Sequence, residues 1–228
     1  MSEASHLTHE DRHRALVERL TANVQPIRRI WPVGVRLGLW MVLEACVLAW
    51  VSAHTTNHFQ EKLTQPAYAI EIVSFAAAAI ISAALALRSA IPGRSLPASE
   101  TALAAVLVLA GAMLVSVAEP MNTANRLGDF VRQGLPCAYS TGMFAVLPWL
   151  GLWWAVRRGT PMRSGLPGVL IGGAALSFSF AMMRVACPSD EPLHLLTWHL
   201  LPALILTVFS GLAGMVWLKL RSPSRDPA

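Results

Sequence analysis

The chain has 228 residues, of which 54% are hydrophobic and only 14% are charged. A soluble domain usually carries about 25% charged residues, so this chain has too few polar side chains to cover a globule in water. The composition therefore excludes an ordinary soluble domain and indicates an integral membrane protein. The net charge of +5 also raises the alternative of nucleic-acid binding, which the distribution of the basic residues tests below.

The first 30 residues are charged throughout and have no apolar core before a small-residue cleavage site, so we expect them to stay in the mature protein. Thr8 followed by Asp11 has the form of a capping box at a helix start. The apolar residues that follow at intervals of four are Leu16, Leu20 and Val24. The pattern predicts a helix of about sixteen residues with one narrow apolar stripe, ended before Pro26.

So short a helix is marginal in water and needs a surface to bury its stripe. Arg28, Arg29 and Trp31 favour a helix that lies on the membrane interface. Five arginines against four acidic residues in this segment give no strong attraction to acidic lipid. Docking of the apolar face into the groove of a soluble partner is the functional alternative.

Six apolar stretches are long enough for transmembrane helices, which need about 20 residues each. They lie near residues 34–54, 67–89, 101–118, 136–156, 166–187 and 193–218. We therefore predict an all-α polytopic membrane protein with a six-transmembrane-helix bundle over residues 34–218. A short cytoplasmic N-terminal helical arm, residues 1–33, precedes the bundle, and a cytoplasmic tail, residues 219–228, follows it.

Lysine and arginine are distributed unequally between alternate loops. Fourteen of the 18 lie in the N-terminal segment, the loops after the second and fourth stretches, and the tail. The remaining four are Lys62, Arg126, Arg132 and Arg184. The positive-inside rule places both termini in the cytoplasm. Because the basic excess follows the topology, direct nucleic-acid binding has little support.

In this topology Cys137 opens the fourth stretch and Cys187 ends the fifth, so both thiols lie near the outer surface at similar depth. His194 and His199 follow at the start of the sixth stretch. Two thiols and two imidazoles suit a soft divalent metal ion, and the thiols alone suit a redox-switched disulfide. A third interpretation is that all four residues pack separately. The residues themselves leave these alternatives open.

Two histidines five positions apart lie about 140° apart around an α-helix. We therefore expect at most His194 to face Cys187 directly, unless the helix start is irregular. The third cysteine, Cys46, lies well inside the first stretch and is expected to be a small buried apolar residue. No C-x-x-C pair indicates a zinc ribbon, an iron–sulfur cluster or a thioredoxin-type centre.

Ionisable residues inside transmembrane spans are costly and usually face a partner. Glu71 and Arg184 lie at comparable depth and are candidates for an intramembrane pair, whereas Glu44 lies mid-span without an obvious partner. Small residues at intervals of four also recur, as in Gly168 with Gly172. They permit close helix approach, within the chain or in a homodimer.

Several of these segments together resemble the NrsF family of six-span membrane anti-sigma factors. The likeness is carried by "LVERLTANVQPIRRIWPVGVRLGLW", a cysteine opening the fourth span, an "RRGTP" loop, "CPSDEPLH" and a "WH" pair in the sixth span. It covers most of the chain outside residues 55–130. The resemblance implies an arm that holds a cytoplasmic ECF sigma factor at the bacterial inner membrane, and two outer cysteines that sense heavy metal or oxidative stress.

By motif position, the sensor thiols would be Cys137 and Cys187. The residues that the arm would offer to the sigma factor are Leu16, Leu20, Val24, Pro26, Ile27, Arg28 and Arg29. The soluble zinc-binding anti-sigma pattern H-x-x-x-C-x-x-C is absent from the sequence, so metal chemistry would belong to the outer face. Participation of the two histidines is inferred from their proximity alone.

The sequence thus predicts a non-enzymatic anti-sigma factor that releases its partner when the outer thiols change. No obligatory cofactor is expected, and a soft divalent metal ion at the outer face is the one candidate. Two alternatives come from other classes. A small metal-ion transporter would use Glu44, Glu71 and the thiols but would not need the arm. A membrane thiol oxidoreductase would need a second dithiol, for which only Cys46 is left.

Overall fold

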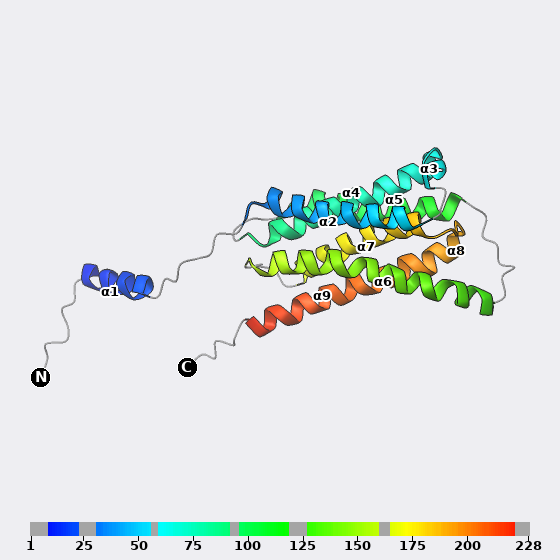
Figure 1. The fold of residues 1–228 in the computed structure, drawn as a ribbon. Coiled ribbons are helices and arrows are strands. Elements are labelled where there is room, and N and C mark those ends of the chain that lie inside the picture. Colours follow the sequence, from blue (N-terminus) through cyan, green and yellow to red (C-terminus); the bar gives the residue numbers. More distant parts are fainter. Residues whose placement is uncertain are drawn as a thin grey trace, which may run out of the picture. The chain divides into compact units, whose positions relative to one another are not determined.

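The computed structural model describes residues 9–22, 31–55, 59–91, 96–118, 127–159 and 165–221. The chain falls into two compact units, Met1–Ile30 and Trp31–Ala228, which are considered separately. The first unit contains the helix α1 (His9–Ala22), and the second contains all the other helices (Figure 1).

Helix α1 lies where the arm helix was predicted, and 14 of its residues are described. Leu16 and Val17 are 53% and 55% exposed, so no described residue of this unit covers these two apolar side chains. The side chain of Leu20 is outside the described part. So are the remaining predicted contact residues of the arm: Val24, Pro26, Ile27, Arg28 and Arg29.

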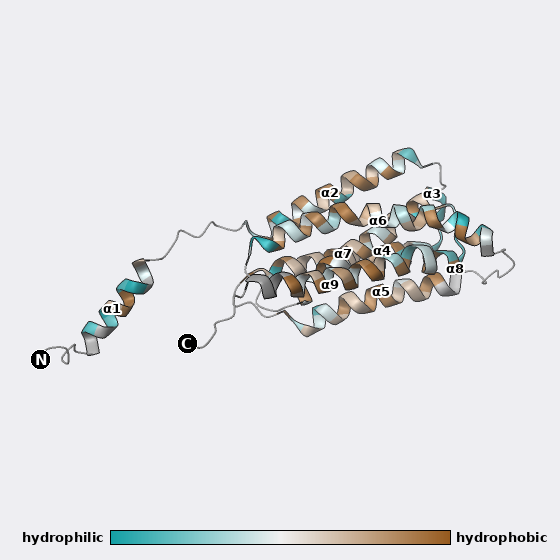
Figure 2. Ribbon diagram, turned by 90° about the horizontal axis from the view of Figure 1, so that it is seen from below, coloured by the Kyte–Doolittle hydropathy of each residue, from teal (hydrophilic) through white to brown (hydrophobic). Residues whose placement is uncertain are grey.

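The second unit is a bundle of helices whose described residues contain no β-strand. Its elements are α2 (Val33–His54), α3 (Phe59–Lys62), α4 (Pro66–Ser89), α5 (Ala98–Ala118), α6 (Leu127–Arg157), α7 (Leu166–Ala186), α8 (Pro192–Leu195), the π-turn η1 (Leu196–Leu200) and α9 (Leu201–Arg221). Among the described residues, six segments are long and apolar enough to cross a membrane, the last of them running through α8, η1 and α9. Figure 2 shows the resulting apolar colouring of the bundle. The predicted all-α, six-span architecture is confirmed.

One helix differs in length from the expectation. α6 begins at Leu127, well before the apolar run that starts at 136, and has 31 residues. Its first turns carry Asp129 and Arg132, so a hydropathy pattern alone does not include them. Both Pro136 and Pro148 lie inside this helix, as packed transmembrane helices tolerate.

The helix α7 forms the centre of the bundle and packs against α4, α6 and α9. It meets α9 at glycines: a Cβ on Gly168 would lie 2.3 Å from the Ser210 carbonyl oxygen, and one on Gly172 would lie 2.7 Å from Thr207 Cα. The Ser210 hydroxyl donates to the Gly168 carbonyl oxygen at 2.6 Å. These small residues therefore serve close packing within the chain.

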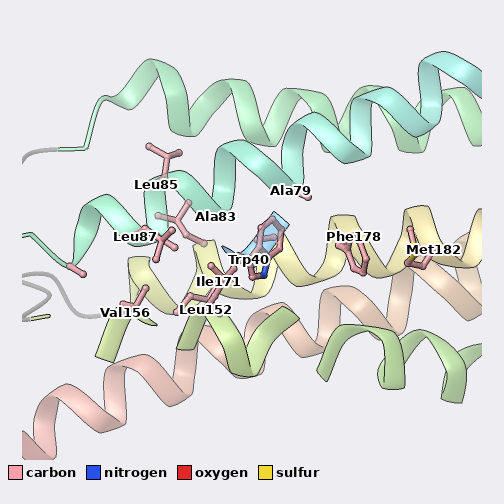
Figure 3. Packing of buried hydrophobic residues seen from close by; sticks show 14 residues of the cluster. Trp40, Ala79, Ala83, Leu85, Leu87, Leu152, Val156, Ile171, Phe178 and Met182 are labelled. Atoms are coloured by element: carbon pink, nitrogen blue, oxygen red, sulfur yellow. The ribbon is translucent and has the colours of Figure 1, made fainter. Parts of the chain in front are cut away.

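Helix α2 lies at the edge of the bundle and is held through a few side chains. Trp40 belongs to the buried apolar cluster seen in Figure 3, where it lies among residues of α4, α6 and α7. Its ring meets Phe178 edge to face at 6.4 Å, and its indole N–H donates to the Pro148 carbonyl oxygen at 3.3 Å.

A second contact of α2 lies near its first turn. The Arg36 guanidinium donates to the carbonyl oxygens of Ala155 and Leu87, at 3.3 and 3.5 Å. These acceptors lie in the last turns of α6 and α4, where carbonyl groups lack helical partners and carry partial negative charge. Arg36 thereby joins the start of α2 to the ends of two other helices.

A cysteine and histidine cluster at one end of the bundle

At the other end of the bundle, four potential ligands come together from different elements: Cys137 of α6, Cys187 after α7, His194 of α8 and His199 of η1. We call them the cysteine–histidine cluster. Cys187 stands where α7 ends. It adopts an extended conformation, with φ −83° and ψ 129°, because Pro188 disfavours a helical conformation in the residue before it.

The donor atoms of the cluster are close to one another. The sulfur atoms of Cys137 and Cys187 are 3.8 Å apart, and the Cys187 sulfur lies 3.6 Å from Nε2 of His194. One ligand atom from each of the four residues lies within 4.8 Å of the others. Both cysteines are free thiols. The cluster could therefore hold a metal ion, and its thiols also lie near enough for a small movement to join them.

His199 belongs to the cluster, against the expectation from an α-helical spacing. The reason is the π-turn η1, where the Leu201 N–H donates to the Leu196 carbonyl oxygen five residues back. The wider turn brings positions five apart nearer to one face of the helix. Pro202 explains why the turn is wide, because its ring opposes a regular α-helical turn and it has no N–H to donate to Trp198.

The imidazole of His199 is fully buried, and neither ring nitrogen has a hydrogen-bond partner among the described residues. Its neighbours are the rings of Phe180 and His194, at centroid distances of 6.2 and 5.3 Å. Buried ring nitrogens are nearly always hydrogen-bonded or bound to a ligand. His199 is thus an imidazole with two donor sites that the described chain leaves unused.

Two aromatic side chains that no sequence pattern indicated, Phe130 and Trp198, pack beside the cluster. The Phe130 ring lies 6.5 Å from His194 and 5.5 Å from Trp198. Trp198 packs against α6 at Gly134, where an added Cβ would lie 2.1 Å from the indole. This glycine stands less than one turn before Cys137, and was the one available signal that a large side chain packs there.

Next to the cluster lies a charged network of four residues: Lys62, Glu71, Arg184 and Asp190. Arg184 makes two hydrogen bonds to the Glu71 carboxylate, at 2.7 and 3.3 Å, and a third to Asp190 at 2.8 Å. Lys62 also donates to Asp190, at 2.6 Å. The structure thus brings the candidate pair Glu71 and Arg184 together. Its two basic and two acidic groups make the network electrically neutral.

Tyr68 adds two contacts to this network, and the network in turn lowers the pKa of Asp190. The Tyr68 hydroxyl donates to the Arg184 carbonyl oxygen, and the guanidinium lies 4.7 Å from the centre of the tyrosine ring. Partial burial raises the pKa of Asp190, but the hydrogen bonds from Lys62 and Arg184 outweigh that effect and hold the pKa below its ordinary value. Asp190 and Cys187 share one short turn, so the network and the cluster are directly connected.

Two other residues of interest lie in α2. Cys46 is exposed on the surface of the bundle, so the expectation that it is buried is wrong; α2 turns only one narrow face to its neighbours. Glu44 is buried, and its carboxylate oxygens have no hydrogen-bond partner among the described residues. Neither residue belongs to the cysteine–histidine cluster.

Comparison with known proteins gives one family. A family model described as NrsF, negative regulator of sigma F, matches residues 20–220. The matched range contains the whole cysteine–histidine cluster, the charged network and the six candidate spans. No curated protein and no solved structure matches the chain.

Proposed function

Because the chain belongs to the NrsF family, whose members are negative regulators of a sigma factor, we propose that it is a non-enzymatic membrane anti-sigma factor. It holds an ECF-type sigma factor at the bacterial inner membrane through its cytoplasmic N-terminal arm. The cysteine end of the bundle faces outward and senses heavy metal or oxidative stress. A change at Cys137 and Cys187 then releases the sigma factor.

The exposed apolar stripe of α1 supports the role of the arm. Leu16 and Val17 are more than half exposed on a unit separate from the bundle. A helix of 14 residues gains little stability alone and becomes ordered when its stripe is buried. A groove on a sigma factor would supply that surface by the helix-in-groove mode. The apolar side chains exposed on the bundle, in contrast, fit a surrounding of lipid.

The observation that carries the sensing role is the convergence of two thiols and two imidazoles within 4.8 Å. Three helical segments and one turn contribute to this cluster. A ligand that binds all four residues, or a bond between the two sulfurs, therefore changes how α6, α7 and the sixth span sit against one another.

Contacts already described offer a route from that change to the arm. α6 carries Cys137 in its first half and Ala155 in its last turn, and the Ala155 carbonyl accepts a hydrogen bond from Arg36. Arg36 begins the span that directly follows the arm. A shift of α6 would therefore act on the start of α2. A difference of about 2–3 kcal/mol between two packings would change partner affinity about 30- to 150-fold.

The geometry supports the two alternative functions, a metal-ion transporter and a thiol oxidoreductase, less well than the anti-sigma function. The described cavity between α6, α7 and α9, about 170 Å³ in volume, is lined by apolar side chains such as Trp149, Leu176 and Phe209. The lining of this cavity offers no polar side chains along which a transported metal ion could move. An oxidoreductase would need a second dithiol, and the exposed Cys46 is a single thiol. The experiments below also distinguish these activities from sigma-factor binding.

The first test is co-purification of the cognate sigma factor with the tagged full chain and with a chain lacking residues 1–30. We expect the truncation to abolish binding and Leu16→Glu to weaken it strongly, because both remove the apolar stripe. Thr21→Glu, an exposed polar position on the same helix, is the matched control and should bind normally. A sigma factor that stays bound to the truncated chain, or never binds the full chain, would contradict the proposal.

The second test addresses the thiols. Cys137→Ser combined with Cys187→Ser should abolish the rise in sigma-dependent reporter expression under cadmium or peroxide. Cys46→Ser serves as the control for loss of a cysteine outside the cluster and should respond as the wild type. An unchanged response in the double variant would exclude the sensing role of the two thiols.

A further inference from the structure

We propose that the cysteine–histidine cluster is a closed, four-coordinate site for a divalent ion of the zinc type. His194 and His199 act as ligands on equal terms with the thiolates of Cys137 and Cys187. The use of this site in signalling rests on the proposed function, but the site itself is a property of the bundle. It would exist whatever partner the arm binds.

Two of the separations between donor atoms already match a tetrahedral site, and the whole set, within 4.8 Å, needs only a small contraction to close around an ion. With zinc–sulfur bonds of about 2.3 Å and zinc–nitrogen bonds of about 2.0–2.1 Å, tetrahedral angles place two sulfurs about 3.8 Å apart and a sulfur and a nitrogen about 3.6 Å apart. The two sulfurs of Cys137 and Cys187 are 3.8 Å apart, and Cys187 and His194 are separated by 3.6 Å. A disulfide instead requires about 2.05 Å between the sulfurs.

The burial of His199 provides an independent argument. The imidazole of His199 is fully buried, and no described residue hydrogen-bonds to either of its nitrogens. Such burial is costly, because both polar atoms have left water without replacement. A ligand bond from one nitrogen to a metal ion removes part of that cost. The π-turn η1 turns this ring toward the cluster, so the local backbone serves the same arrangement.

Charge neutrality also favours the assignment. A metal ion of charge +2 bound by two thiolates and two neutral imidazoles forms a site of zero net charge. Such a site can be buried without an additional counter-ion. The neighbouring charged network does not disturb this balance, since Lys62 and Arg184 neutralise Glu71 and Asp190.

The ligand set defines the class of ion. Two thiolates and two imidazoles suit zinc and other thiophilic ions, whereas magnesium and calcium prefer oxygen ligands. Four protein ligands leave no open position for substrate, so the site is structural or regulatory and not catalytic. Larger thiophilic ions such as cadmium would compete for the same four atoms.

Metal binding and disulfide formation then exclude each other, because both use the sulfurs of Cys137 and Cys187. In the metal-free chain, a peroxide would oxidise the two thiols: an S–S bond forms, the O–O bond breaks, and the two thiol protons leave in two water molecules. Bound zinc holds both sulfurs as ligands at the wider spacing. A metal-loaded chain should therefore form the disulfide more slowly than the metal-free chain.

The test uses the full chain, purified in detergent under reducing conditions, stripped with a chelator and titrated with cobalt and then zinc. We expect one ion per chain, the visible absorption of tetrahedral cobalt with a thiolate-to-cobalt charge-transfer band, and displacement of cobalt by zinc. His199→Phe and His194→Phe, which keep an aromatic ring in place, should each weaken zinc binding by at least about 10- to 100-fold. His54→Phe, a histidine of α2 outside the cluster, should bind as the wild type.

Absence of stoichiometric binding would overturn the inference, and so would wild-type affinity in His199→Phe. X-ray absorption of the zinc-loaded wild type gives a second measurement that does not depend on variants that fold. It should show two sulfur and two nitrogen neighbours, and any other composition overturns the four-ligand site. Since the titration needs no sigma factor and co-purification needs no added metal, failure of one proposal is distinguishable from failure of the other.

Discussion

The helices α7 and α2 differ more than any other pair of spans in how the bundle holds them. Within the chain, 83% of the apolar span of α7 is buried, against 11% for α2. Glycines of α7 touch the α9 backbone, whereas a Cβ added to Gly34 or Gly38 of α2 would meet no atom within 4 Å. Neighbouring helices therefore surround α7 and hold it in place, whereas only a few side-chain contacts hold α2. In the proposed function, the sensing cluster includes the residue that ends the most buried span, and the arm directly precedes the least buried span in the sequence.

The largest effect is expected from a charge carried by α7. Arg184→Met would leave the Glu71 carboxylate, which is 2% exposed, without its guanidinium partner. Removal of one partner of a buried ion pair typically costs about 3–5 kcal/mol. Unfolding of the detergent-solubilised chain measures this loss, and the double variant with Glu71→Leu should regain much of it.

The control for this prediction is the ion pair between Arg88 and Glu100, whose side chains are 34% and 41% exposed. Arg88→Gln should cost no more than about 1 kcal/mol. Equal losses for Arg184→Met and Arg88→Gln would mean that the buried network contributes no more than a surface pair.

Glycine substitutions compare the two helices directly. Gly168→Ala and Gly172→Ala should each destabilise the chain by about 1–3 kcal/mol, because the added methyl group overlaps the backbone of α9. Gly38→Ala in α2 has open space and should be neutral, or stabilising by up to about 1 kcal/mol. The midpoint of thermal unfolding measures all three. A destabilising Gly38→Ala would show that α2 packs more tightly than its contacts indicate.

The smallest effect concerns pH at the junction of the charged network and the cluster. Hydrogen bonds lower the pKa of Asp190, so its stabilising contribution is present above the ordinary aspartate pKa of about 3.9 and is lost as pH falls through the lower folded value. Because the side chain is 38% exposed, we expect no more than about 1 kcal/mol. Asp190→Asn should be less stable than the wild type at pH 7, and the difference should vanish in strong acid.

The six spans could be predicted from the sequence because each apolar run reports its own burial in lipid. The start of α6 could not be predicted in this way. The helix begins before the apolar run, and its first turns carry the charged residues Asp129 and Arg132. The exposure of Cys46 depends on which neighbours α2 lacks, and no local pattern carries that information.

The cluster was predictable in part. Topology places Cys137 and Cys187 at the same depth, but only the packing of α6 against the end of α7 sets their spacing. The position of His199 depends on a wide turn that no α-helical spacing contains. Pro202 was the available signal, and its effect could be read only together with the residues that precede it.

The wide turn has a consequence for how the sixth span is read on a helical wheel. A wheel drawn forward from Pro192 loses its phase at Leu196–Leu200, because that turn holds one residue more than an α-turn. Each residue of α9 is then displaced by about 100° from the place the wheel assigns to it. Deletion of one residue from the turn would rotate His194 by about 100° relative to the face of α9 that packs on α7, and so away from the cysteines. Pro202 is not one of the four candidate ligands, yet it influences the angular offset between the two halves of this span.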